Sequence, residues 1–87
     1  MKILLSKRFE RDFKKLAKGN KGLENKISNV VNHLSINPFQ PSLKTHKLKG
    51  KLENVWACKI TGDVRILFEF TQDEDVLSML LLSIGTS

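Results

Sequence analysis

Cysteine and long apolar runs are scarce in this sequence of 87 residues. Cys58 is the only cysteine, which excludes an internal disulfide and a zinc site built from cysteines. No apolar run approaches the roughly 20 residues of a membrane-spanning helix. Near the start, the apolar run Ile3-Leu4-Leu5 ends at Ser6 and charged residues follow, so the run is too short for the core of a signal peptide. We therefore expect a protein of the reducing cytoplasm.

Common catalytic and cofactor motifs are missing as well. The two histidines, His33 and His46, and the scattered acidic residues lack the spacing of metal ligands. The sequence has no glycine-rich phosphate loop and no Ser-His-Asp arrangement that could be recognised. We therefore expect no metal and no cofactor. His33 lies beside the apolar stripe of an expected helix, where a histidine is usually structural.

Positive charge dominates the composition. The 15 lysines and arginines outnumber the 9 acidic residues, which gives a formal net charge of +6 and a pI near 9.7. This balance favours an anionic partner, either nucleic acid or an acidic protein, although a soluble basic protein need not have one. The length suits one domain over residues 1–87, and the sequence shows no repeats, low-complexity tracts or linkers.

The first half of the chain predicts one strand and two helices. The run Ile3–Leu5 predicts a strand, and Ser6 is a suitable N-cap for the helix that follows. Over residues 7–18 the apolar residues recur at helical spacing. The opposite face is mostly basic, with Lys7, Arg8, Arg11, Lys14, Lys15 and Lys18. That face is either simply solvated or turned toward phosphates. A second helical periodicity predicts a helix that ends near Ser35.

The second half predicts strands. The loop Lys44–Lys51 has four lysines and one histidine but no acidic residue. Apolar residues then alternate with other residues on both sides of Thr61-Gly62-Asp63, which predicts an antiparallel hairpin. The nearly continuous apolar run Val76–Ile84 predicts a last strand that is central in the sheet and covered on both faces. The order β-α-α-β-β-β predicts an α+β fold, with two helices packed on a mainly antiparallel, four-stranded sheet.

The hairpin and the basic loop together form the candidate site. Arg65 lies on the opposite strand face from its apolar neighbours, so its guanidinium can face the basic loop and bind a phosphate through two hydrogen bonds. Lys59, on the other arm of the hairpin, can add a second charge. A strand floor with a cationic rim suits a polyanionic ligand. Trp56 can stack on a base, but its place in an alternating strand is more typical of a core residue.

Several stretches together resemble a known family. They are the basic loop before a strand with Trp56, the segment Gly62-Asp63-Val64-Arg65-Ile66, and the closing Ile84-Gly85-Thr86. With the order β-α-α-β-β-β, they resemble the RelE/ParE superfamily of bacterial toxins, and within it the YafQ/RelE-type mRNA interferases, over essentially the whole chain. The resemblance implies the toxin of a type II toxin-antitoxin pair, which cleaves mRNA without a metal and often on the ribosome. It also implies a cognate antitoxin that wraps around the toxin in a hetero-oligomer.

The resemblance assigns roles to individual residues. The family's mRNA-contacting arginine falls on Arg65, and the basic residue on the strand before the turn falls on Lys59. The histidine ahead of that strand falls on His46, and the turn aspartate falls on Asp63. His46 is either a catalytic base or an ordinary loop residue, and Asp63 either shapes the turn or orients a neighbour. The lysines of the basic loop are the candidate RNA-binding residues: Lys44, Lys47, Lys49 and Lys51.

One position departs from the family pattern. Many YafQ-like toxins carry a principal catalytic histidine directly after Ile-Gly-Thr, where this chain has Ser87. Three functions are therefore weighed: an endoribonuclease that cleaves mRNA, a catalytically impaired toxin that only binds antitoxin and RNA, and a ParE-like gyrase inhibitor. The lysine-rich loop and Arg65 favour the first function over the third.

Overall fold

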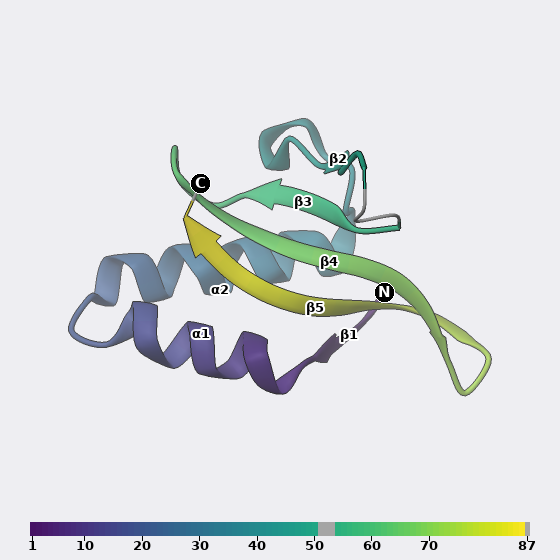
Figure 1. Ribbon diagram of the computed structural model, residues 1–87, viewed down its shortest axis with the longest axis horizontal. Coiled ribbons are helices and arrows are strands. Elements are labelled where there is room, and N and C mark those ends of the chain that lie inside the picture. Colours follow the sequence, from purple (N-terminus) through teal and green to yellow (C-terminus); the bar gives the residue numbers. More distant parts are fainter. Residues whose placement is uncertain (51–53, 87) are drawn as a thin grey trace.

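The computed structural model describes residues 1–50 and 54–86, which form two helices packed on a five-stranded sheet (Figure 1). The helices are α1 (Lys7–Ala17) and α2 (Lys21–Ile36). The strands are β1 (Lys2–Leu5), β2 (His46–Lys47), β3 (Trp56–Lys59), β4 (Val64–Asp73) and β5 (Val76–Thr86), and a short 3-10 helix, η1 (Pro41–Leu43), precedes β2. The predicted α+β class is confirmed.

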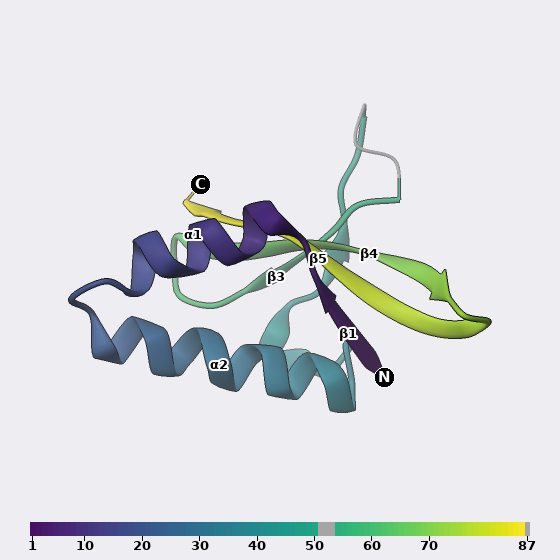
Figure 2. The ribbon, with the colours of Figure 1, turned by 90° about the horizontal axis from the view of Figure 1, so that it is seen from below.

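Side-chain caps fix where the two helices begin. The hydroxyl of Ser6 accepts a hydrogen bond from the backbone N–H of Phe9, as expected for the predicted N-cap. The side chain of Asn20 accepts one from the N–H of Leu23 and starts α2 in the same way. The chain reverses direction between the end of α1 and the cap of α2, so the two helices lie antiparallel (Figure 2). Helix α2 ends at Ile36, close to the end expected from its periodicity.

The strands follow the order β1-β5-β4-β3-β2. Strand β1 pairs with β5 in parallel, and the other three pairings are antiparallel. The last strand of the chain is therefore an internal strand, as predicted. Because β1 comes from the start of the sequence, its pairing with β5 joins the first and last strands of the chain at one edge of the sheet.

The sheet has five strands rather than the predicted four, because part of the basic loop joins it. His46 and Lys47 pair with Ala57 and Trp56 of β3. A strand of two polar residues has no apolar alternation that a sequence could reveal. Its existence depends on the neighbouring strand, which supplies the backbone partners.

The core lies between the helices and one face of the sheet. Its buried members come from α1, α2, η1, β3, β4 and β5: Phe9, Ile27, Leu34, Leu43, Cys58, Val64, Ile66, Phe68, Met79, Leu81 and Ile84. Both helices lie on the same face, so β5 is not covered on both faces as predicted. Leu80 and Leu82 are only half-buried as a result. The other face of the sheet, called here the open face, carries the site.

Helix α1 completes the edge of β5 beyond the end of β1. The hydroxyl of Ser6 donates a hydrogen bond to the carbonyl of Leu82 at 2.9 Å. The carboxylate of Asp12 accepts one from the backbone N–H of Ile84 at 3.0 Å. Backbone groups that β1 does not reach are thus paired with side chains of the helix. Neither described helix is long and apolar enough to cross a membrane.

Candidate functional site

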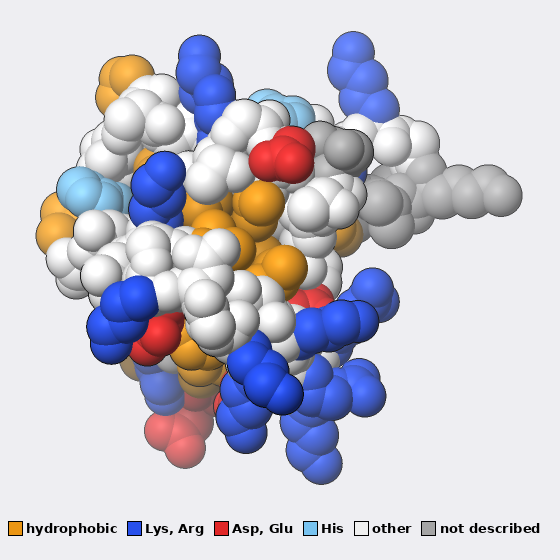
Figure 3. All heavy atoms as spheres, turned by 90° about the vertical axis from the view of Figure 1, so that its left-hand side faces the viewer, with side chains coloured by type: hydrophobic (Ala, Val, Ile, Leu, Met, Phe, Trp, Pro, Cys, Tyr) orange, Lys and Arg blue, Asp and Glu red, His pale blue; other side chains and the backbone are white. Residues whose placement is uncertain are grey.

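A hollow lies where the β3–β4 hairpin meets the basic loop. Its volume is about 310 Å³. Its charged and titratable lining comes from three segments of the chain: Lys44, His46, Lys59, Asp63 and Arg65. Ala57, Cys58 and Val64 are the apolar part of the lining, and Thr61 and Gly62 belong to the turn. We call this the cationic hollow. Figure 3 views this end of the molecule and shows hydrophobic side chains between basic side chains.

Strand register places two positively charged side chains of the hairpin side by side. Lys59 of β3 is directly opposite Arg65 of β4, and residues opposite each other project from the same face. On the other side of Arg65 the β5 partner is Gly85, where an added Cβ would meet no atom within 4 Å. The guanidinium therefore has open space on that side. In residues 1–50 and 54–86, neither Lys59 nor Arg65 forms an ion pair with an acidic residue.

The backbone of the basic loop orients His46. Lys44 has a left-handed backbone with φ of 49°, and its carbonyl oxygen lies 3.0 Å from His46 Nδ1. A carbonyl can only accept a hydrogen bond, so Nδ1 carries the proton in this contact. In the neutral ring, Nε2 is then free to accept a proton. The hydroxyl of Thr45 donates to the carbonyl of Pro38 at 2.6 Å and anchors the loop behind this contact.

Asp63 is held by its own turn. Its carboxylate accepts a hydrogen bond from the hydroxyl of Thr61 at 3.2 Å, and the same hydroxyl accepts the N–H of Val64 at 3.2 Å. These contacts match the turn-shaping role for Asp63. Among the described residues Asp63 forms no ion pair with Arg65 or His46. Sequence reasoning did not single out Thr61, although a Thr-Gly-Asp turn is a recognisable signal for such a hydroxyl.

Cys58 and Trp56 belong to the packing beneath the site. Burial raises the pKa of the Cys58 thiol to about 12, although a hydrogen bond from the backbone of Ile66 partly opposes this. The thiol is therefore protonated and inert at neutral pH. The ring of Trp56 contacts Phe39 and Phe70 edge-on, at centroid distances of 5.3 and 5.8 Å. Trp56 is thus a packing residue on the helix side of the sheet and does not line the cationic hollow.

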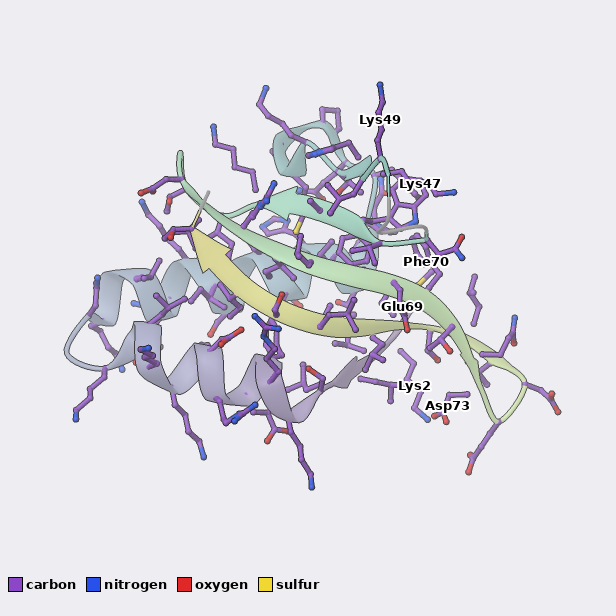
Figure 4. All side chains as sticks on the ribbon, viewed as in Figure 1. Lys2, Lys47, Lys49, Glu69, Phe70 and Asp73 are labelled. Carbon is purple, nitrogen blue, oxygen red and sulfur yellow. The ribbon has the colours of Figure 1, made fainter. Side chains whose placement is uncertain are left out.

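The four candidate RNA-binding lysines separate into groups. Lys44 lines the cationic hollow. Lys47 follows His46 on a strand, so its side chain projects from the opposite face, and Lys49 is exposed beyond it. Figure 4 shows Lys47 and Lys49 at the β2 edge, away from the Lys2–Asp73 ion pair. The prediction for Lys51 falls outside the described residues, as does Ser87.

A second hollow on the open face was not anticipated. It is lined by residues of β4 and β5, of the segment just before β3, and of the start of α1: Ser6, Arg8, Val55, Leu67, Leu82 and Ser83. Its volume is about 380 Å³. We call it the apolar hollow. No sequence motif connects these residues, because their proximity depends on the strand order and on the position of α1.

Comparison with known proteins now identifies the family. Residues 1–87 match the family described as the bacterial toxin of type II toxin-antitoxin systems, YafQ. The chain belongs to the YafQ toxin family. The predicted resemblance to YafQ-type toxins is thereby confirmed. No curated protein matches the sequence.

Solved toxin structures share the fold of this YafQ-family chain. The YoeB/ParE toxin from Agrobacterium tumefaciens has a TM-score of 0.83 at 17% identity, over 100% of this chain and 99% of that one. A metal-bound toxin from Helicobacter pylori has a TM-score of 0.78 at 29% identity, over 99% and 93% of the two chains. The YoeB-YefM complex from Staphylococcus aureus has a TM-score of 0.75 at 22% identity, over 100% and 97%.

The metal named for the Helicobacter toxin has no counterpart in the described part of this YafQ-family toxin. Within residues 1–50 and 54–86, no three His, Cys, Asp or Glu side chains come together as a set of metal ligands. His46 and Asp63, the two residues of those types in the rim of the cationic hollow, are each engaged by neighbouring turn or loop atoms. The chemistry available in this hollow is that of lysine, arginine and histidine.

Proposed function

We propose that this toxin is an endoribonuclease that cleaves mRNA without a metal and thereby stops translation and growth. The observation that carries the proposal is the meeting of Lys44, His46, Lys59 and Arg65 around one hollow. Three separate segments supply these residues, so the cluster does not follow from a single basic stretch. An RNA phosphate is the ligand whose charge matches the opposed cations of the hairpin.

RNA cleavage of this kind begins when the 2′-oxygen attacks the adjacent phosphorus. The phosphorus–5′-oxygen bond then breaks, which leaves a cyclic phosphate and a new 5′-hydroxyl. Negative charge builds on the phosphoryl oxygens during the attack. Arg65 is placed to hold two of these oxygens through its planar fork, and Lys59 adds a second positive charge directly across the hairpin. Preorganised charge of this type is usually the largest contribution to such a reaction.

His46 is the group that moves the proton. Its Nδ1–H is held by the carbonyl of Lys44, which leaves Nε2 to take the proton of the 2′-hydroxyl. The departing 5′-oxygen needs a proton in return. Lys44 or the imidazolium formed in the first step supplies it. A positioned base or acid contributes roughly 10²- to 10⁴-fold to the rate of such a step.

The partners follow from the same proposal. One similar structure is a toxin-antitoxin complex from Staphylococcus aureus, which supports a cognate antitoxin that binds this toxin in a hetero-oligomer. The substrate in this proposal is mRNA, and cleavage is tested most directly with mRNA bound to the ribosome. An antitoxin partner and an mRNA substrate are both consistent with activity in the cytoplasm. The net charge of +6 suits an RNA substrate as well as an acidic antitoxin segment.

Controlled expression in bacteria tests the proposal. The wild-type chain should arrest growth and create new internal 5′ ends in mRNA, mapped by primer extension. Arg65→Ala should abolish both effects while the purified protein remains folded, as cooperative thermal unfolding shows, because Arg65 lies on the open face of the sheet. Lys21→Ala is the matched control, since it removes an exposed cation at the start of α2, outside the hollow. Growth arrest and cleavage by the Arg65 variant would contradict the proposal.

Ser87 supports a second candidate, a toxin that binds antitoxin and RNA without cutting. The family's histidine at this position is replaced by a serine, which cannot serve as a proton donor or acceptor near neutral pH. Intact mRNA in arrested or normally growing cells would favour this candidate, and Ser87→His should then restore cleavage. Inhibition of DNA supercoiling by the purified toxin would instead favour a gyrase inhibitor.

A further inference from the structure

The apolar hollow adjoins the cationic hollow along β4, where Arg65 lines the cationic hollow and Leu67 lines the apolar one. Leu67 follows Arg65 by two positions on β4, and Ser83 precedes Gly85 by two positions on β5. Residues two apart on a strand project from the same face, roughly 6.6 Å from one another. A ligand held at Arg65 therefore reaches the apolar hollow with its next chemical group. The volume of about 380 Å³ lies in the range of small-ligand pockets.

A β-bulge shapes the floor of the apolar hollow. The β4–β5 register shifts between Leu67 and Phe68, which leaves Leu82 as an extra residue between the partners Leu81 and Ser83. Bulges of this kind redirect a side chain and are frequent beside functional sites. Here Leu82 lines the hollow together with Leu67. The carbonyl of Leu82 is held by Ser6, so the distortion is supported by the start of α1.

The rim of the apolar hollow is polar, whereas its floor is apolar. The side chain of Arg8 is 74% exposed, and its Nε lies 4.0 Å from the carboxylate of Asp12. A guanidinium in this position can lie flat over a ring bound on the floor. Ser83 places a hydroxyl on the other side, and in the described part of the chain that hydroxyl makes no hydrogen bond. An apolar floor with donors at the rim suits a flat aromatic group with polar edges.

The charges along β4 fix the direction of such a ligand. Arg65, Leu67 and Glu69 follow one another on the open face. Phosphate is attracted to the Arg65 end and repelled by Glu69, so the uncharged part of a nucleotide lies over Leu67. We propose that the apolar hollow binds one nucleobase, that of a nucleotide next to the phosphate held by Lys59 and Arg65. This inference rests on the proposed ribonuclease function and gives it a source of base preference.

Mapping of mRNA 5′ ends in expressing cells tests the base site. Burial of one base is worth roughly 1–3 kcal/mol, so the wild type should cut about tenfold more often when its preferred base stands at one position beside the cut. Ser83→Phe fills the hollow, and Leu67→Ala removes part of its floor without adding bulk. Both variants should lose this preference. Ser28→Phe adds the same ring to the exposed side of α2 and should retain it.

The outcomes separate the base site from the ribonuclease. If the variants at Ser83 and Leu67 cut with the wild-type rate and preference, the base site is wrong while the nuclease stands. If the wild type makes no new 5′ ends, both proposals fail. Thermal unfolding of the purified variants shows whether each one folds. Should Ser83→Phe not fold, the preference of Leu67→Ala decides the question alone, because that change only shortens an apolar side chain at a half-buried position.

Discussion

Lys59 and Arg65 are directly opposed on the β3–β4 hairpin, so two cations project side by side from the open face. Like charges in this position destabilise a sheet by a few tenths of a kcal/mol to about 1 kcal/mol. A bound phosphate reverses that cost, because each cation then contacts an anion instead of its neighbour. The hairpin thus lowers the stability of the free protein and raises its affinity for phosphate.

The first prediction is that this opposition can be relieved. Lys59→Met keeps the length of the side chain and removes the charge, so the free protein should gain about 0.2–1 kcal/mol. Wild-type protein should be stabilised by inorganic pyrophosphate, and the variant much less. Thermal unfolding with and without pyrophosphate measures both effects. Lys21→Met, at an exposed position of α2, serves as control. A variant that is less stable than the wild type, or equally stabilised by pyrophosphate, would contradict the account.

The second prediction concerns the shape of the Arg65 cation. Arg65→Lys preserves the charge but loses the planar fork that binds two phosphoryl oxygens. Loss of one preorganised donor usually lowers the rate by about 10²- to 10³-fold. The lysine variant keeps the positive charge, so it should retain a measurable part of the wild-type rate. Its cleavage rate should therefore fall between those of the wild type and Arg65→Ala. Equal rates for lysine and arginine would mean that only charge matters here.

The third prediction separates the base from its hydrogen bond. His46→Asn retains an N–H donor for the carbonyl of Lys44 but provides no group that accepts a proton. Cleavage should slow by roughly 10²- to 10⁴-fold, while RNA binding changes little. Single-turnover cleavage and a filter-binding assay measure the two quantities. The control is His33→Asn, since His33 contacts Gln40, does not line the cationic hollow, and should leave cleavage unchanged when replaced.

The fourth prediction tests the contact between α1 and β5. Asp12→Ala leaves the backbone N–H of Ile84 without its acceptor, which should lower the free energy of unfolding by about 1–3 kcal/mol. Asp12→Asn keeps a side-chain oxygen and should cost less. Urea unfolding of both variants provides the comparison. If the two substitutions cost the same, charge rather than the hydrogen bond holds the edge of β5.

The fifth prediction is a pH dependence from Cys58. Burial raises the pKa of this thiol from 9.0 to about 12. Between these values the native protein keeps a proton that the unfolded chain has lost, so stability should fall as the pH rises, by at most about 1.4 kcal/mol per pH unit. Below pH 9 the contribution is complete. Cys58→Ala should remove this part of the slope, so the difference in stability between wild type and variant should shrink as the pH rises above 9. Parallel curves for both proteins would show an ordinary thiol.

Sequence patterns predicted the parts of this toxin that depend on local order. Alternation around Thr61-Gly62-Asp63 is a property of the hairpin alone, and it placed Lys59 and Arg65 on one face, as the register confirms. The cap at Ser6 is local as well. Which loop residues reach the hollow is not local. It depends on the pairing of His46 with Ala57, which turns Lys47 to the other face.

Features that require several distant segments could not be predicted. The apolar hollow needs α1, β3, β4 and β5 in their final positions, and its floor needs a bulge at Leu82. Nothing in the run Met79-Leu80-Leu81-Leu82 marks where the register shifts. For the same reason the continuous apolar run predicts a strand covered on both faces, whereas the helices cover only one face of β5.

The parallel pairing of β1 with β5 has a consequence for how this toxin is made. Strand β5 lies between β1 and β4, yet it is the last of the strands to be synthesised. While a ribosome is still making the chain, both neighbours wait without their shared partner, and the helices have no complete sheet to pack on. We therefore expect folding to be completed after the chain is released from the ribosome and not during its synthesis. Lys59 and Arg65 therefore reach their final positions in the complete sheet only after the last strand has been made.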